Sequence, residues 1–181
     1  MDQRICQDGG GNAGRRAQEV PVRLFREYRP LPLRLAQEIA VDMPARVIFI
    51  DSQYFIAISS KDDQWYELSM QAARTLSDAV RFVTTYDVLS EFLAAVSRGN
   101  PDTRLRAVSQ VRNIFADDTI TLVPQTLELF TSGLQLYASR PDKRYSLTDC
   151  ISMTVMRELD ITEVLTHDRD FENEGFIRLI R

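Results

Sequence analysis

Short runs of β-branched and aromatic residues alternate along most of the chain with longer segments in which apolar residues recur every three or four positions. The short runs are typical of buried strands, and the spaced apolar positions are typical of helices with one buried face. From Arg46 onward, the pattern predicts strands at residues 46–50, 81–84, 119–123, 162–166 and 175–180. It predicts helices at residues 64–79, 86–98, 102–116, 125–139 and 148–159.

Local signals support several of these helix ends and faces. The Gly99-Asn100-Pro101 segment ends one helix, Pro124 opens another, and Thr148 is the predicted cap of the last. In the helix at residues 102–116, we expect four residues to face the core: Leu105, Val108, Val111 and Phe115. The helix at residues 125–139 carries a similar apolar stripe, formed by Leu127, Phe130, Leu134 and Tyr137.

Strands that alternate with helices of this length are joined by right-handed crossovers, which produce a mainly parallel sheet covered on both faces. We therefore expect residues 46–181 to form one three-layer α/β/α domain around about five short strands. In such sheets, ligands bind beyond the carboxyl ends of the strands, where the strand order reverses. The residues that follow the predicted strands are thus the first candidates for a functional site.

The first 45 residues differ in composition from the rest of the chain. Four of the seven glycines lie between Gly9 and Gly14, prolines follow, and seven arginines accompany six acids. Such sequence is typical of a poorly ordered extension, and we expect at most one short helix in it, at residues 33–41. We favour the interpretation that Met43 is the natural start and that residues 1–42 are an over-extended reading frame. A peptide from residues 1–42 in the mass spectrum of the native protein would contradict it.

Composition excludes several kinds of site. The one histidine, His167, rules out zinc and non-haem iron centres built on several histidines. The two cysteines, Cys6 and Cys150, are too few for a thiolate zinc site and indicate a reducing compartment, so we expect a cytoplasmic protein. No apolar run is long enough to span a membrane. The net charge of -4 argues against a protein that holds nucleic acid by overall positive charge.

Acidic residues stand at the ends of the predicted strands. Asp51 directly follows the first strand, and Glu91 lies in the helix after the second. Asp149 lies in the first turn of the last predicted helix, and Asp168 follows the fourth strand, with Asp170 close behind it. All belong to the same edge of a parallel sheet, where converging carboxylates repel one another unless a cation neutralises them. Oxygen ligands without histidine or cysteine suit Mg²⁺ or Mn²⁺, ions that lower the pKa of an attacking water.

Each acid also has a purely structural interpretation. Asp51 could cap a helix or a turn, Asp149 could interact with a helix dipole, and Asp168 could cap the turn before Phe171. Glu91 could be a solvated helix residue, although it borders an apolar stripe. Taken together, four acids at one edge of the sheet favour a functional interpretation.

Four segments resemble, in the same order, the motifs of the PIN domain, the ribonuclease fold of bacterial toxins of the VapC type. They are Val-Ile-Phe-Ile-Asp-Ser at residues 47–52, the segments at 85–92 and 145–152, and Leu-Thr-His-Asp-Arg-Asp-Phe at 165–171. The resemblance extends over residues 46–181 and leaves the first 45 residues unexplained. It implies a metal-dependent endoribonuclease that cleaves single-stranded or loop RNA, held by a cognate antitoxin protein and paired with a second copy of itself.

The resemblance also assigns roles to the acids. Asp51 and Asp149 would be the chief ligands of Mg²⁺ (or Mn²⁺), and Glu91 and Asp168 would complete the acidic pocket and share the catalytic role. Asp170 is an alternative to Asp168. As supporting groups, the hydroxyls of Ser52 and Thr166 are expected to hydrogen-bond the carboxylates.

Other polar and aromatic residues near the motifs have two interpretations each. Residues 140–144 precede the third motif and could grip a phosphate or form a solvated loop. We expect His167 to be a strand-end residue rather than a base, and the region from Trp65 to Leu68 to be core rather than an exposed surface for stacking bases. The candidate RNA contacts are Arg104, Arg106, Arg112, Arg140, Lys143, Arg144 and Arg169.

A second hypothesis is a catalytically inactive PIN-fold module that binds RNA or protein. Such a module would have lost part of the acidic pocket, and the presence of four matched acids weighs against it. The net charge then has another interpretation, because residues 46–181 hold 15 basic and 20 acidic residues and four of these acids are assigned to a metal pocket. Divalent cations in that pocket would make the acid surplus compatible with an RNA substrate.

Overall fold

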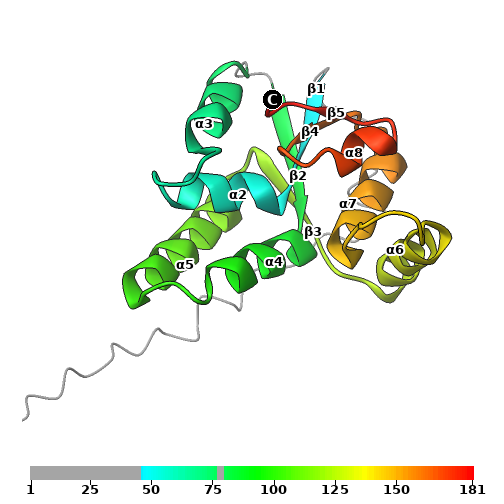
Figure 1. Cartoon of the computed structure of the whole chain (residues 1–181), viewed down its shortest axis with the longest axis horizontal. Coiled ribbons are helices and arrows are strands. Elements are labelled where there is room, and N and C mark those ends of the chain that lie inside the picture. The colour runs from blue at the N-terminus through cyan, green and yellow to red at the C-terminus, as the bar shows by residue number, and fades with distance from the viewer. Residues whose placement is uncertain (1–45, 77–79) are drawn as a thin grey trace, which may run out of the picture.

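The computed structural model describes residues 46–76 and 80–181 and shows a central sheet with helices on both sides (Figure 1). The strands are β1 (Arg46–Ile50), β2 (Val80–Thr85), β3 (Ile120–Val123), β4 (Glu163–Leu165) and β5 (Ile177–Arg178). Their order is β3-β2-β1-β4-β5, and every neighbouring pair is parallel. The predicted parallel sheet of short strands is therefore confirmed. The expectations for residues 1–45, including the helix at 33–41, lie outside the described residues.

The helices form the two outer layers. They are α2 (Ser52–Ser59), α3 (Tyr66–Arg74), α4 (Tyr86–Val96), α5 (Pro101–Ala116), α6 (Leu127–Ser139), α7 (Leu147–Glu158) and α8 (Asp170–Asn173). Figure 1 shows α2 to α5 on one side of the sheet and α6 to α8 on the other, which confirms the three-layer α/β/α architecture. Within the described ranges, no helix combines the length and the apolar character needed to cross a bilayer.

Helices α2 and α8 are the two elements that the hydrophobic pattern does not predict. A helix of one or two turns contains too few positions for a period of 3.6 residues to show. Helix α2 begins directly after Asp51, whose side chain accepts a hydrogen bond from the Gln53 backbone N–H. The structural interpretation of Asp51 as a helix cap is therefore correct. The cap uses the Oδ2 atom and leaves the Oδ1 atom free to accept from another group.

The core is densest around β1 and α7. Ile48 and Phe49 on β1 are fully buried, as expected for a central strand covered on both faces. Half of α7 is buried, namely Cys150, Ile151, Ser152, Met153, Val155 and Met156. Helix α6 lies directly on α7, because a Cβ placed on Gly133 would come within 2.5 Å of a side-chain atom of Ile151. This packing fixes the helix that carries Asp149.

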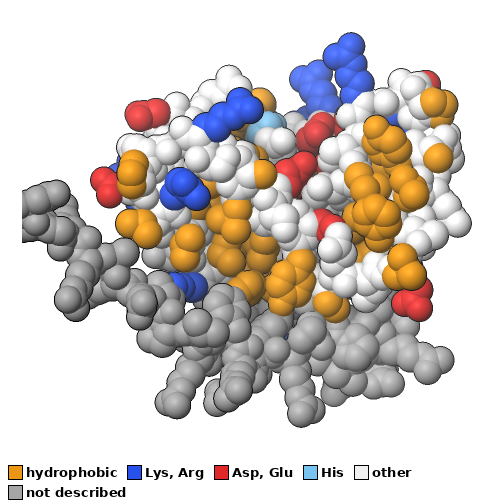
Figure 2. Space-filling view, turned by 90° about the horizontal axis from the view of Figure 1, so that it is seen from below, with side chains coloured by type: hydrophobic (Ala, Val, Ile, Leu, Met, Phe, Trp, Pro, Cys, Tyr) orange, Lys and Arg blue, Asp and Glu red, His pale blue; other side chains and the backbone are white. Residues whose placement is uncertain are grey.

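The predicted inward faces of α5 and α6 are partly wrong. Leu105 on α5 is 66% exposed and Val108 is 40% exposed, while Ala107 and Ile114 are buried. On α6 the whole predicted stripe is exposed, with fractions of 82% for Leu127, 37% for Phe130, 46% for Leu134 and 50% for Tyr137. Helix α6 instead packs through Leu129 and Gly133. Figure 2 shows a broad apolar patch on the side of the molecule where α6 lies.

Candidate metal centre at the switch point of the sheet

The order in which the chain adds strands to the sheet reverses between β1 and β4, although all strands stay parallel. From β1 the chain adds β2 and then β3 on one side, and it then crosses over to place β4 on the other side of β1. The crevice beyond the carboxyl ends of two such strands is where parallel sheets bind ligands. Asp51 follows β1 and Thr166 follows β4, so both lie at this point.

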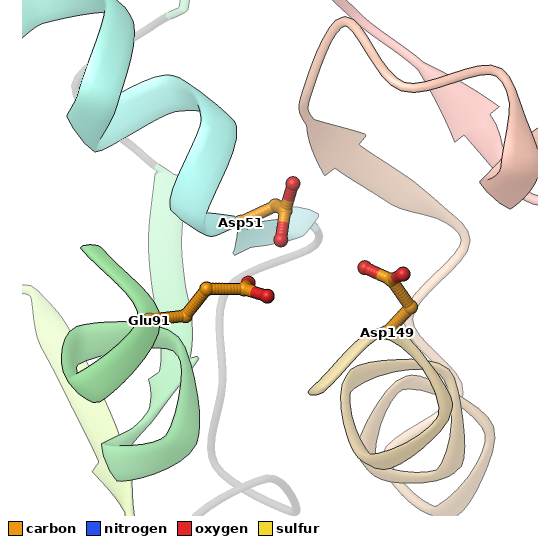
Figure 3. A group of neighbouring side chains, drawn as sticks. All are labelled: Asp51, Glu91 and Asp149. Carbon is orange, nitrogen blue, oxygen red and sulfur yellow. The ribbon is translucent and has the colours of Figure 1, made fainter. Parts of the chain in front are cut away.

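Three of the four predicted acids meet there. Asp51, Glu91 and Asp149 each offer a carboxylate oxygen, and these oxygens all lie within 4.8 Å of one another. Asp51 precedes α2, Glu91 lies on α4 and Asp149 lies in the first turn of α7. Figure 3 shows the three carboxylates pointing toward a common space from these separate elements. We call this group the carboxylate cluster.

Asp51 is the most deeply buried member of the carboxylate cluster. Its Oδ2 accepts hydrogen bonds from the Thr166 hydroxyl at 2.8 Å and from the Gln53 backbone at 3.3 Å. Its Oδ1 is buried and has no hydrogen-bond partner among the described residues. Burial, and then the charge of Asp149, raises the pKa of Asp51 to about 7. A buried acceptor without a donor, facing other carboxylates, indicates a place for a cation.

Asp149 is held by the start of its own helix. Ser146 is the N-cap of α7, and the Asp149 Oδ2 accepts the Ser146 backbone N–H at 2.7 Å while the Ser146 hydroxyl accepts the Asp149 N–H at 3.0 Å. This capping box replaces the predicted cap, Thr148, which lies inside the helix. Burial, followed by the charges of Glu91 and Asp168, raises the pKa of Asp149 to about 6 against these hydrogen bonds.

Glu91 completes the carboxylate cluster from the opposite side. Its Oε2 accepts a hydrogen bond of 2.7 Å from the buried hydroxyl of Ser52. The two hydroxyl groups predicted to support the carboxylates therefore do so, Thr166 on Asp51 and Ser52 on Glu91. Both hydroxyls fix the direction of an acceptor oxygen, which is how supporting residues orient metal ligands.

Asp168 lies beside the carboxylate cluster but outside the group of three. Its backbone N–H donates to the Thr166 hydroxyl at 3.0 Å, and its Oδ1 accepts the Asp170 backbone N–H at 2.9 Å, so it caps the turn that leads into α8. Its charge still raises the pKa of Asp149. Asp170 is the first residue of α8, and its carboxylate accepts from the Asn173 side chain at 3.2 Å. The role of either acid as the fourth ligand stays a prediction.

The chemistry of the donor set fits a hard divalent cation. All three groups of the carboxylate cluster offer oxygen, and none of the ion pairs formed by the residues at 46–76 and 80–181 includes any of them. Arg140, a candidate for contact with RNA, instead donates to Glu174 at 2.8 Å. Carboxylate oxygens held by hydroxyls and helix caps are the ligands that Mg²⁺ and Mn²⁺ prefer.

Sequence reasoning missed the group of side chains that fastens the loop before α7. The nearly buried carboxylate of Glu174 accepts hydrogen bonds from Arg140, from Arg157 and, at 3.2 Å, from the Tyr145 hydroxyl. Tyr145 directly precedes the Ser146 cap, so Glu174 helps to set where α7 begins. No local pattern signals these contacts, because Arg140, Tyr145 and Arg157 lie 34, 29 and 17 residues from Glu174 along the chain.

Three solved structures are similar in fold to this chain. VapC20 of Mycobacterium tuberculosis, described as a sarcin-ricin loop cleaving toxin, is 21% identical, with a TM-score of 0.64 over 72% of this chain and 96% of that chain. FitAcB from Neisseria gonorrhoeae and VapBC2 from Rickettsia felis, the latter bound to a DNA fragment from its promoter, are both 13% identical. Their TM-scores are 0.51 and 0.50, and in both cases 73% of this chain and 96% of the other is covered.

Identities at this level show the fold alone, and no curated protein sequence matches the chain significantly. The family is shown by a different comparison. The model of the PIN domain family matches residues 48–176, a span that begins within β1 and includes the whole carboxylate cluster and α8. The order of motifs, the parallel sheet and the match over most of the chain agree, and the chain therefore belongs to the PIN domain family.

Proposed function

We propose that this protein is a metal-dependent endoribonuclease that hydrolyses RNA phosphodiester bonds. The observation that carries the proposal is the convergence of Asp51, Glu91 and Asp149 within 4.8 Å without a cationic side chain paired to them among the described residues. Membership of the PIN domain family supports a nuclease, and all three acids lie within the span that matches the family model, residues 48–176. Asp168 is the proposed fourth acid of the site.

The proposed roles follow from the contacts of each residue. Asp51, Glu91 and Asp149 would hold Mg²⁺ or Mn²⁺, with Asp168 at the edge of the pocket. Such an ion, when bound, neutralises charge on the phosphate and lowers the pKa of an attacking water. Within the chain, the Thr166 hydroxyl fixes the Oδ2 of Asp51, so that the partnerless Oδ1 is the oxygen available to a ligand.

We further propose that the protein is the toxin of a type II toxin–antitoxin pair, with a cognate antitoxin and a second copy of itself as partners. The likeness in fold to VapC20, a toxin, supports this. Exposed apolar side chains on α5 and α6 supply surface for protein partners, whereas the helix predicted at residues 64–79 exposes only Leu68 among its large described apolar residues. An RNA substrate implies a cytoplasmic site of action.

Cleavage of structured RNA in Mn²⁺ tests the enzyme activity. Wild-type protein should cleave the RNA, EDTA should stop cleavage, and Asp51→Asn should abolish it without unfolding the protein. Asp118→Asn is the matched control, because Asp118 is an exposed acid outside the carboxylate cluster. Calorimetric titration with Mn²⁺ provides a second measurement on the same proteins, with binding expected for wild type and Asp118→Asn only.

Two results would contradict the proposal. Equal cleavage by wild type and Asp51→Asn would mean that the activity belongs to a contaminant or to another site. No cleavage by either protein, together with RNA or protein binding, would favour the second candidate, a catalytically inactive PIN-fold binding module.

A further inference from the structure

The one tryptophan and the one histidine of the chain stack on each other. The Trp65 indole and the His167 imidazole have ring centroids 4.5 Å apart, and their planes are 7° from parallel. Trp65 directly precedes α3, whereas His167 follows β4, so the stack joins segments far apart in the sequence. Both side chains are only half-buried, so part of this aromatic surface is open to solvent.

The backbone on each side of the stack is held in place. The backbone N–H of Trp65 donates a hydrogen bond of 2.8 Å to the Asp63 carboxylate, in the turn that connects α2 to α3. The His167 carbonyl accepts a hydrogen bond of 3.2 Å from the buried Arg178 guanidinium. Two anchored segments present the rings in a fixed orientation, which reduces the entropy that a ligand must overcome on binding.

The stack adjoins the carboxylate cluster. His167 lies between Thr166, whose hydroxyl holds Asp51, and Asp168, whose charge acts on Asp149. Consecutive Cα atoms are about 3.8 Å apart, so the backbone of His167 adjoins both of these residues.

Packing accounts for only part of this arrangement. Trp65 packs in part against the hydrophobic core, but an aliphatic side chain at position 167 would serve packing at least as well as an imidazole. Because the two rings stack face to face, a further flat group can stack only on an outer face of the pair. Flat aromatic surfaces beside a backbone-binding site are where proteins stack the unpaired bases of RNA.

We propose that Trp65 and His167 form a stacking platform for an unpaired nucleobase of the substrate, next to the phosphate that is cleaved. The proposal rests on the ribonuclease function proposed above, and it assigns to these two residues the recognition of unpaired bases that the family resemblance leaves without a structural basis. A base in a continuous helix is already stacked on its neighbours and cannot reach the platform. The platform thus selects single strands and loops over paired RNA.

The single tryptophan allows a direct test, because all indole fluorescence of the protein comes from Trp65. The Asp51→Asn protein, which should not cleave, is titrated in Mg²⁺ with a short single-stranded oligoribonucleotide and, separately, with the same strand in a full duplex. The single strand should quench the fluorescence at concentrations where anisotropy shows binding, and the duplex should not. Equal quenching by both RNAs, or binding of the single strand without quenching, would overturn the platform.

Cleavage kinetics test the second ring in otherwise wild-type protein. His167→Ala should raise KM about tenfold with little change in kcat, and His167→Phe, which keeps a flat ring, should restore KM. Tyr137→Ala is the matched control, because Tyr137 is an exposed aromatic residue on α6 away from the carboxylate cluster. An unchanged KM in a folded His167→Ala protein would overturn the role of His167.

The same experiments separate this proposal from the proposed nuclease function. RNA cleavage by wild type without fluorescence quenching would overturn the platform alone. Quenching by the single strand, with no cleavage by wild type under any metal condition, would overturn the nuclease and leave a binding surface that selects unpaired bases.

Discussion

Glu174 and Asp51 both have buried carboxylates, but the pKa of Glu174 is lowered whereas that of Asp51 is raised. Burial disfavours the charge of Glu174, yet the hydrogen bonds from Arg140, Arg157 and Tyr145 together outweigh it and hold its pKa below the usual range. Two guanidinium groups and a phenol therefore satisfy this carboxylate within the protein. Its role is structural, because it ties the turn after α8 to α7 and to the loop before it.

The carboxylate cluster lacks such partners. Burial raises the pKa of Asp51 to about 7 and that of Asp149 to about 6, and neighbouring carboxylates add to both shifts. Hydroxyls and backbone N–H groups orient the oxygens but bring no positive charge. Burial is thus common to both places, and the presence or absence of a cationic side chain separates the structural carboxylate from those proposed to bind a metal.

The largest expected difference between the two places is in catalysis. Asp149→Asn should lower kcat/KM for RNA cleavage at least about 100-fold, because an amide cannot replace a charged ligand of the metal. Glu174→Gln should lower it less than about tenfold, because Glu174 acts only through the position of α7. Steady-state cleavage kinetics measure both. A larger loss for Glu174→Gln than for Asp149→Asn would reverse the assignment.

Folding stability should depend on Glu174 more than on the acids of the carboxylate cluster. Glu174→Ala should lower the free energy of unfolding by about 2 kcal/mol, less than for a fully buried pair because Arg140 and Arg157 are partly exposed and regain water. Asp142→Ala is the control. Asp142 is 69% exposed and pairs with Lys143 at 3.9 Å, so its loss should cost less than about 0.5 kcal/mol. Urea denaturation gives both values, and similar losses would show that Glu174 has no special structural role.

The free energy of unfolding of the metal-free protein should depend on pH, because burial and mutual repulsion disfavour the charged carboxylates of the cluster. An unfolded Asp loses its proton near pH 3.8, whereas in the folded protein Asp149 and Asp51 keep theirs up to about pH 6 and 7. The folded state binds more protons in this window, so the free energy of unfolding should fall as the pH rises from 4 to 7.

Asp51→Asn sharpens that test, because it removes the largest of these shifts. In EDTA at neutral pH, this protein should be more stable than wild type by about 2 kcal/mol and should show a shallower fall with pH. Thermal or urea unfolding at several pH values measures both effects. A wild-type stability that rises between pH 4 and 7 in EDTA would contradict the assigned shifts.

A smaller effect is expected from the supporting hydroxyl on Asp51. Thr166→Val keeps the shape of the side chain and removes the hydrogen bond of 2.8 Å, so Mn²⁺ affinity should fall about tenfold. Thr131→Val provides the comparison, because its hydroxyl bonds only the backbone of α6. Calorimetric titration with Mn²⁺ distinguishes them, and equal affinities would remove Thr166 from the site.

The smallest expected change in Mn²⁺ affinity is that caused by replacing Asp168, at the edge of the carboxylate cluster. Asp168→Asn should weaken Mn²⁺ binding only about threefold, because Asp168 acts on Asp149 through its charge and is engaged in the turn before α8. A loss as large as that of Asp51→Asn would instead make Asp168 a direct ligand. The Asp170→Asn protein, measured alongside, decides between the two acids.

The sequence was sufficient to place the three acids of the carboxylate cluster, because strand ends can be located without knowing any contact. The pattern puts Asp51 after β1 and Asp149 in the first turn of α7, and parallel strands bring such positions to one edge. The S-x-x-D spacing of Ser146 and Asp149 also carried the signal of a capping box, which the prediction of Thr148 as the cap overlooked.

Other features depend on contacts that no local pattern contains. Helix α6 has apolar residues on more than one side, and Gly133 decides which side packs, because only a residue without a side chain allows the close approach to Ile151. The partners of Glu174 come from α7 and from the loop between α6 and α7, so they become neighbours only after the helices have packed. The stack of Trp65 on His167 likewise joins α3 to the end of β4.

Asp51 both caps α2 and is a proposed metal ligand, and this double role has a genetic consequence. Asparagine caps helices about as well as aspartate, so Asp51→Asn removes the charge and keeps the start of α2. An aspartate codon becomes an asparagine codon through a single G-to-A transition. A single nucleotide change can therefore remove the charge of Asp51 and still leave the cap that α2 needs to fold.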